Sequence, residues 1–147
     1  MRKPRAPLTR SEIMARVKGR DTKPELKLRR ALHAAGLRYR LHSKDLPGKP
    51  DIVFRSARLA IFVHGCFWHH HHGCEHARMP KSSLDFWDPK LRANIERDAR
   101  QAEALQALGW TVLTLWECET RDTNVVSAFV HNVALRVRAI TTIKTDR

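Results

Sequence analysis

The chain has 147 residues, a length typical of a single domain that can bury a hydrophobic core. Its 28 Lys and Arg outnumber 15 Asp and Glu, and the resulting net charge of +13 favours binding to a polyanion such as a nucleic acid. No apolar run reaches the roughly 18 residues of a membrane span, and the basic start lacks the apolar core of a signal peptide, so we expect a soluble, cytoplasmic protein rather than a membrane or secreted one.

The N-terminal segment is basic and rich in proline. Residues 1–20 carry seven Lys or Arg and little apolar surface, so we expect an arm that becomes ordered on DNA. Thr9 and Glu12 have the spacing of a capping box, which predicts a short helix that includes Met14. The remaining residues, 21–147, contain no linker or repeat and are expected to form a single domain.

A second capping-box spacing, from Thr22 to Glu25, predicts a longer helix that Gly36 ends. Residues 37–41 alternate between apolar and polar side chains and predict a short strand.

Two apolar runs, residues 51–54 and 59–64, predict paired strands across a polar turn. The second run is apolar on both faces, which is typical of a central strand. A loop rich in Cys and His follows over residues 65–84.

Asp88 followed by Pro89 has the pattern of a helix N-cap and first helical residue, so a long helix is expected to begin there. Its predicted buried stripe is Leu91, Ile95, Ala102 and Leu105. Residues 110–116 predict a third apolar strand, and Asp122 with Thr123 caps a last helix. The order of elements predicts an α/β fold, a mixed central sheet flanked by helices.

Residues 64–74 hold five histidines and two of the three cysteines. Zinc prefers four thiolate or imidazole ligands, and Cys66, Cys74 and Cys118 converge if the strand before Cys118 lies beside residues 59–64. One histidine would complete a structural zinc site, and spacing leaves several candidates: His70, His71, His72 and His76. The alternative is three reduced cysteines beside a solvated loop.

Asp51 places a carboxylate at the start of a strand. Phosphodiester hydrolysis commonly uses Mg²⁺, which prefers carboxylate oxygens, and a neutral imidazole from His64 or His69 can act as general base. Asp51 as a turn residue, His64 as a core histidine and Glu25 as a helix cap are the competing interpretations.

Phe67 and Trp68 are large aromatics in a polar loop, where core packing explains them poorly. Proteins that deform DNA insert apolar side chains between base steps, and a mismatched step is easier to open. The pair is therefore a candidate mismatch wedge, and Trp87 is either a core residue or a second wedge.

Several motifs appear in order along most of the chain: Pro47-Gly-Lys-Pro-Asp51, His64-Gly-Cys-Phe-Trp-His-His-His-His72, Asn94-x-Glu-Arg-Asp98 and Trp116-Glu-Cys118. They closely resemble the very short patch repair (Vsr) mismatch endonucleases. The resemblance implies a restriction-endonuclease-like fold with a structural Zn²⁺. It also implies Mg²⁺-dependent nicking 5′ to the thymine of a T:G mismatch, the product of 5-methylcytosine deamination.

The resemblance also assigns roles. It implies that Asp51 and the Val63 carbonyl bind Mg²⁺, that His69 is the general base, and that Glu25 and His64 support the site. The implied zinc ligands are Cys66, His71, Cys74 and Cys118. The implied DNA contacts are the wedge residues Phe67, Trp68 and Trp87, with Met14 entering from the opposite groove. Gly73 separates the histidine run from Cys74, where the family commonly has the cysteine directly after it, so the choice among His70, His71 and His72 stays open.

The implied partner is double-stranded DNA with a T:G mismatch, and other mismatch-repair proteins are candidate partners. We expect a monomer associated with a bacterial nucleoid. Two alternatives stay open: a restriction-type endonuclease that cuts matched DNA, and a non-catalytic, zinc-stabilised DNA-binding module.

Overall fold

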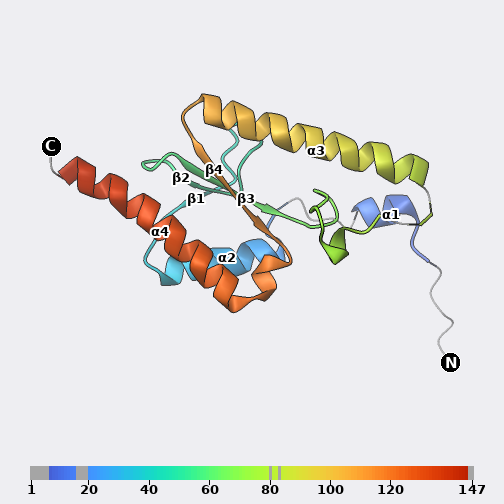
Figure 1. The fold of residues 1–147 in the computed structure, drawn as a ribbon, viewed down its shortest axis with the longest axis horizontal. Helices are drawn as coiled ribbons and strands as arrows, with labels where there is room; N and C mark the ends of the chain where they lie inside the picture. The colour runs from blue at the N-terminus through green and yellow to red at the C-terminus, as the bar shows by residue number, and fades with distance from the viewer. Residues whose placement is uncertain (1–6, 16–19, 80, 83, 146–147) are drawn as a thin grey trace.

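The computed structural model describes residues 7–15, 20–79, 81–82 and 84–145 (Figure 1). Of the predicted N-terminal arm, residues 1–6 and 16–19 lie outside these ranges. The helices are α1 (Arg10–Ala15), α2 (Lys23–Ala34), α3 (Leu84–Ala107) and α4 (Thr123–Thr145), with short 3₁₀ turns η1 (Glu75–Ala77) and η2 (Glu119–Arg121). The strands are β1 (Arg40–Leu41), β2 (Ile52–Phe54), β3 (Leu59–His64) and β4 (Thr111–Trp116).

The strands form one mixed sheet in the order β1-β2-β3-β4. β1, β2 and β3 pair antiparallel, whereas β3 and β4 pair parallel over their full length, from Leu59 beside Thr111 to His64 beside Trp116. The apolar run of residues 59–64 is therefore an inner strand, as its sequence predicts. The predicted mixed sheet flanked by helices is confirmed.

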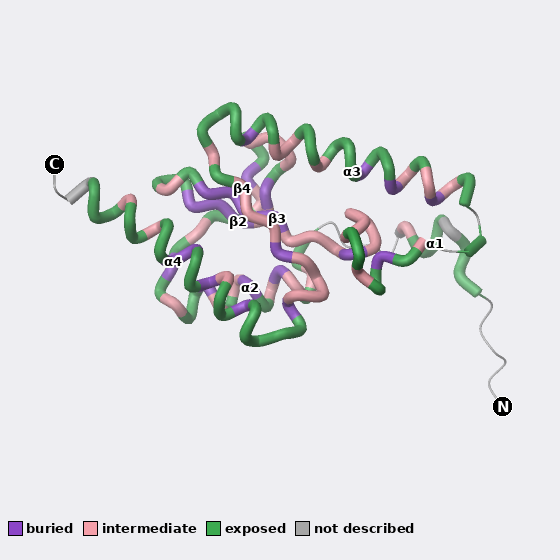
Figure 2. Tube along the Cα trace, in the orientation of Figure 1, coloured by how far each residue is buried: buried purple, intermediate pink, exposed green. Residues whose placement is uncertain are grey.

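Helices cover both faces of the sheet, with α3 on one side and α2 and α4 on the other (Figure 1). Alternate residues of β3 point to opposite faces, which gives the protein two cores. The larger core packs Ile61 against Leu28 of α2 and Val133 of α4. The smaller core packs Phe62 against Leu105 of α3. Figure 2 shows that buried residues concentrate in β2 and β3, the inner strands of the sheet.

Both predicted capping boxes begin helices, but in different ways. Thr9 and Glu12 exchange reciprocal bonds, with the Thr9 N–H donating to Glu12 Oε2 at 2.7 Å and the Glu12 N–H donating to Thr9 Oγ1 at 3.2 Å. Thr22 Oγ1 accepts from the Glu25 N–H at 3.4 Å, but the Glu25 carboxylate does not return to Thr22. It accepts instead from the Asp21 N–H at 2.9 Å, which turns Glu25 toward the interior.

The predicted start of α3 is wrong. The helix begins at Leu84, so Pro89 lies inside it and Asp88 is not its cap. Pro89 removes one helical hydrogen bond, but the earlier turn buries Trp87 against other aromatic rings, and that burial outweighs the loss.

Two further details of the predictions differ. Ile95 is 41% exposed, whereas Asn94 is buried, because the Asn94 side chain donates to the Trp68 carbonyl at 2.9 Å. The strand predicted for residues 37–41 contains only Arg40 and Leu41. Among the described residues, no helix is long and apolar enough to cross a membrane.

Candidate functional site

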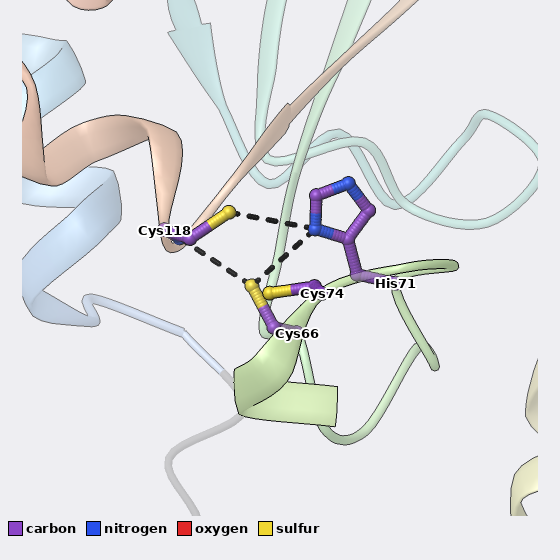
Figure 3. A group of neighbouring side chains, drawn as sticks. All are labelled: Cys66, His71, Cys74 and Cys118. Carbon is purple, nitrogen blue, oxygen red and sulfur yellow. Dashed lines mark hydrogen bonds between the residues drawn. The ribbon is translucent and has the colours of Figure 1, made fainter. Parts of the chain in front are cut away.

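A cluster of three cysteines and one histidine lies where β3 and β4 end (Figure 3). The parallel pairing brings Cys66 and Cys118 together, because each follows its strand by two residues. His71 Nδ1 lies 3.7 Å from Cys66 Sγ and 3.4 Å from Cys118 Sγ. With Cys74, the four ligand atoms all lie within 4.8 Å of one another. The predicted convergence of the sulfurs is confirmed.

The other candidate histidines lie outside this cluster. His72 is exposed, and His76 Nε2 lies 3.0 Å from Arg121 Nη1. His70 adopts a positive φ of 47°, and its Nδ1 atom is buried without a hydrogen-bond partner. His71 is therefore the histidine that the loop brings to the three sulfurs.

The donor set of this cluster fits zinc, for which thiolate and imidazole are preferred ligands. Burial raises the pKa of the Cys66 thiol to about 12 and also raises the pKa of Cys118. Thiolates at these positions therefore need a neighbouring cation. The His71 ring stacks on Trp116 with centroids 4.2 Å apart, which orients its nitrogen toward the sulfurs.

A cleft of about 1130 Å³ opens beside the cluster. Six residues singled out from the sequence line it: Glu25, Asp51, Val63, His64, Trp68 and His69. Positive charge surrounds them, from Arg20, Lys44, Lys49 and Arg97. The cleft therefore combines a polar centre with a basic rim.

Asp51 lies deep in this cleft. Its Oδ2 accepts from the Val63 N–H at 2.8 Å, a bond between the loop before β2 and the end of β3. Burial, with a smaller contribution from the negative charge of Glu25, raises the pKa of Asp51 to about 6, although the Val63 hydrogen bond acts to lower it. A buried carboxylate with one hydrogen bond and an acidic neighbour has an unmet demand for positive charge, which fits a Mg²⁺ ligand.

Two histidines of the cleft are stacked in parallel. The ring centroids of His64 and His69 lie 3.8 Å apart with an interplanar angle of 3°. Burial and then the charge of His69 lower the pKa of His64 to about 4, so His64 is neutral at neutral pH. His69 Nδ1 lies 2.5 Å from Asp98 Oδ2. Of these two stacked histidines, His69 is therefore the one whose positive form has a carboxylate partner at hydrogen-bond distance.

Sequence reasoning assigned no role to Asp98, although it lies in one of the recognised motifs. Asn94 and Asp98 are four residues apart in α3, so they share one helix face. That face meets the Cys/His loop, where Asn94 binds the Trp68 carbonyl and Asp98 binds His69. Two polar residues four positions apart, on the face of α3 that meets the loop, were the sequence signal that could have indicated this contact.

The candidate wedge residues pack on one another. Ring centroids of Phe67, Trp68 and Trp87 lie between 5.1 and 5.8 Å apart in edge-on contacts. Trp87 is buried, whereas Phe67 and Trp68 are half-buried. Met14 lies on α1 and is not among the described residues that line the cleft.

Known proteins resemble this chain over most of its length. The family model "DNA mismatch endonuclease Vsr" matches residues 5–76. The "Type II nicking enzyme V.XorIIP" of Xanthomonas oryzae pv. oryzae is 50% identical over 128 residues, 87% of this chain and 93% of that protein. The "DNA mismatch endonuclease Vsr" of Escherichia coli is 46% identical over 113 residues, 77% of this chain and 72% of that protein. The "Type II nicking enzyme V.NmeAIP" of Neisseria meningitidis is 41% identical over 113 residues, 77% and 80% respectively.

The raised pKa of Asp51 predicts that Asp51→Asn stabilises the Mg²⁺-free protein at neutral pH. Folding raises this pKa from 3.8 to about 6. The ionised carboxylate therefore costs stability, with the cost growing between pH 4 and 6 and reaching about 3 kcal/mol above pH 6. Denaturant unfolding without added Mg²⁺ should show the gain at pH 7.5 and none below about pH 4.

Exposed Glu103 of α3 offers a control, since Glu103→Gln should leave stability nearly unchanged at both pH values. Added Mg²⁺ should raise the stability of the wild type but not that of Asp51→Asn. Equal stability of wild type and Asp51→Asn at pH 7.5 would mean that folding does not raise the pKa of this carboxylate.

Proposed function

The chain belongs to the Vsr family of DNA mismatch endonucleases and is a DNA endonuclease, and on this premise we propose that it nicks duplex DNA 5′ to the thymine of a T:G mismatch. The observation that carries the proposal is the arrangement of one cleft. It holds the buried Asp51, the His69–Asp98 pair and Trp68, within a basic rim that suits a phosphate backbone.

His69 is the proposed general base. A hydrogen bond from Nδ1 to the Asp98 carboxylate leaves Nε2 as the basic nitrogen. A water molecule that attacks the scissile phosphorus transfers its proton to Nε2. The phosphorus–oxygen bond on the opposite side breaks, and its oxygen leaves with the bonding electrons and takes a proton from solvent. Asp98 then stabilises the imidazolium that forms, at 2.5 Å from the ring. His64, stacked beside it and neutral, supports the ring without competing for the proton.

Asp51 and the carbonyl of Val63 are the proposed Mg²⁺ ligands. In a strand, the N–H and C=O of one residue point to the same side, and those of the next residue point to the other. The His64 carbonyl accepts from Glu117 beyond β4 at 2.9 Å, so the Val63 carbonyl faces the opposite side, where its N–H already meets Asp51. Bound there, Mg²⁺ would polarise the scissile phosphate and neutralise its developing charge.

The aromatic cluster provides a physical basis for choosing a mismatch. Phe67 and Trp68 are half-buried against Trp87, and Trp68 also lines the cleft. Opening a stacked base step costs a few kcal/mol in matched DNA and less at a mismatch, so rings inserted there distinguish the two. Met14 is proposed to reach the duplex from α1, on the other groove.

We assign a restriction-endonuclease-like fold to residues 21–147 and a DNA-ordered basic arm to residues 1–20. The cluster of three cysteines and His71 is proposed to hold one structural Zn²⁺. A chain that acts on DNA in this way, as a monomer, works at the nucleoid in the cytoplasm, where other mismatch-repair proteins are its candidate partners.

The proposal is tested with four duplexes that differ in one base pair: T:G, T:A, C:G and A:G. Each strand is labelled separately, and reactions contain Mg²⁺ or EDTA. We expect a single nick on the T strand of T:G, 5′ to the thymine, only with Mg²⁺. Cleavage of both strands of T:A would favour the restriction-type alternative, and nicking in EDTA would exclude the Mg²⁺ mechanism.

Trp68→Ala should reduce the preference for T:G over T:A by roughly 5-fold to 150-fold, because base stacking on an aromatic ring is worth about 1–3 kcal/mol. Binding to matched DNA rests on Lys and Arg and should stay nearly constant. The measurement is the ratio of the two affinities at one fixed salt concentration. Trp68→Phe keeps a ring that can stack and should retain most of the preference; an unchanged ratio in Trp68→Ala would remove the residue from mismatch recognition.

A further inference from the structure

The Arg29 guanidinium lies at the centre of a polar group behind the wall of the cleft. Its Nη1 lies 2.8 Å from Asp21 Oδ1, and its Nη2 lies 2.8 Å from Glu25 Oε2 and 2.9 Å from His42 Nε2. The Arg29 side chain is only 11% exposed. Asp21, Glu25 and His42 have the composition of a metal site, but a resident cation, the guanidinium, already contacts all three.

Arg29 fixes the orientation of Glu25. Oε2 of this buried carboxylate accepts from Arg29 and from the Asp21 N–H, at 2.8 and 2.9 Å. No described residue donates to the other oxygen, Oε1, which is also not among the described buried atoms that lack a partner. Glu25 lines the cleft, and Oε1 is the oxygen that neither Arg29 nor the Asp21 N–H engages.

The same guanidinium reaches the loop that carries Asp51. Arg29 has only donors, so His42 Nε2 accepts its hydrogen bond. The backbone N–H of His42 donates to the Asp51 carbonyl at 3.1 Å. His42 adopts a positive φ of 46°, a costly conformation that these two bonds maintain. Arg29 therefore links the Glu25 helix to the Asp51 loop.

We propose that Arg29 is a positioning residue, which holds Glu25 and, through His42, Asp51 in the geometry that binds Mg²⁺. The inference rests on the proposed Mg²⁺-dependent nicking. Arg29 is not among the described residues that line the cleft, so it acts through its partners and not on DNA. Its planar fork makes three contacts at fixed angles, which a single ammonium group does not reproduce.

Arg29→Lys is the decisive variant, because it keeps the charge and loses the fork. We expect about a tenfold fall in kcat on T:G duplex, with KM for DNA changed by less than about twofold. A second readout needs no activity: the Mg²⁺ concentration that gives half of the maximal rise in Tm of the DNA-free protein should increase about tenfold. Arg30→Ala, an exposed neighbour on α2, should match the wild type in both measurements.

Wild-type kcat and Mg²⁺ dependence in Arg29→Lys would overturn the proposal, since charge alone would then suffice. If this variant does not fold, Asp21→Gly removes the exposed carboxylate that anchors the guanidinium and suits the positive φ of 55° at this position. A fall in kcat together with weaker Mg²⁺ binding then supports the proposal, and wild-type values in folded Asp21→Gly would overturn it. A wild-type protein that does not nick T:G contradicts the proposed function instead, which keeps the two failures distinct.

Discussion

The parallel pairing of β3 with β4 is the constraint on which the site depends. It runs in register to His64 beside Trp116, and the Glu117 N–H extends it by one bond of 2.9 Å to His64. Both strands therefore end at the same edge of the sheet. Cys66 and Cys118 meet there. The loop that starts at this edge carries His69, the proposed general base, and two aromatic rings between Cys66 and Cys74, which belong to the same cluster.

The two carboxylates of the cleft, Asp51 and Glu25, explain why hydrogen-bond donors and cations surround them. Asp51 and Glu25 are carboxylates close enough for the charge of Glu25 to raise the pKa of Asp51. Burying both is costly without compensating cations. Arg29 compensates Glu25 from behind the wall, whereas Asp51 faces the cleft and receives only a backbone N–H. Asp51 is therefore the carboxylate that does not receive the compensation that Arg29 gives to Glu25. A phosphate and a divalent cation would come together beside it.

Sequence patterns predicted the strands and the capped helices because those signals are local. The start of α3 was misassigned because Asp88 with Pro89 is a strong local signal, which the distant packing of Trp87 overrides. The partners of the site are also distant in sequence. Asp98 meets a histidine 29 residues away, and Arg29 meets one 13 residues away, so neither pairing has a spacing that a motif can reveal. The resemblance implied His71, but spacing alone left its neighbours open, because only the path of the loop brings one of these histidines to the sulfurs.

A metal held by the Cys/His cluster is proposed to fix the loop that carries His69, Phe67 and Trp68. Residues 65–78 have few buried side chains, so apolar packing alone is insufficient to order them. The most direct test is amide hydrogen exchange of the zinc-loaded protein before and after chelation. We predict that residues 65–78 lose protection while β3 and α4 keep theirs. Unchanged protection of the loop in verified zinc-free protein would mean that the loop is ordered without the metal, contrary to this proposal.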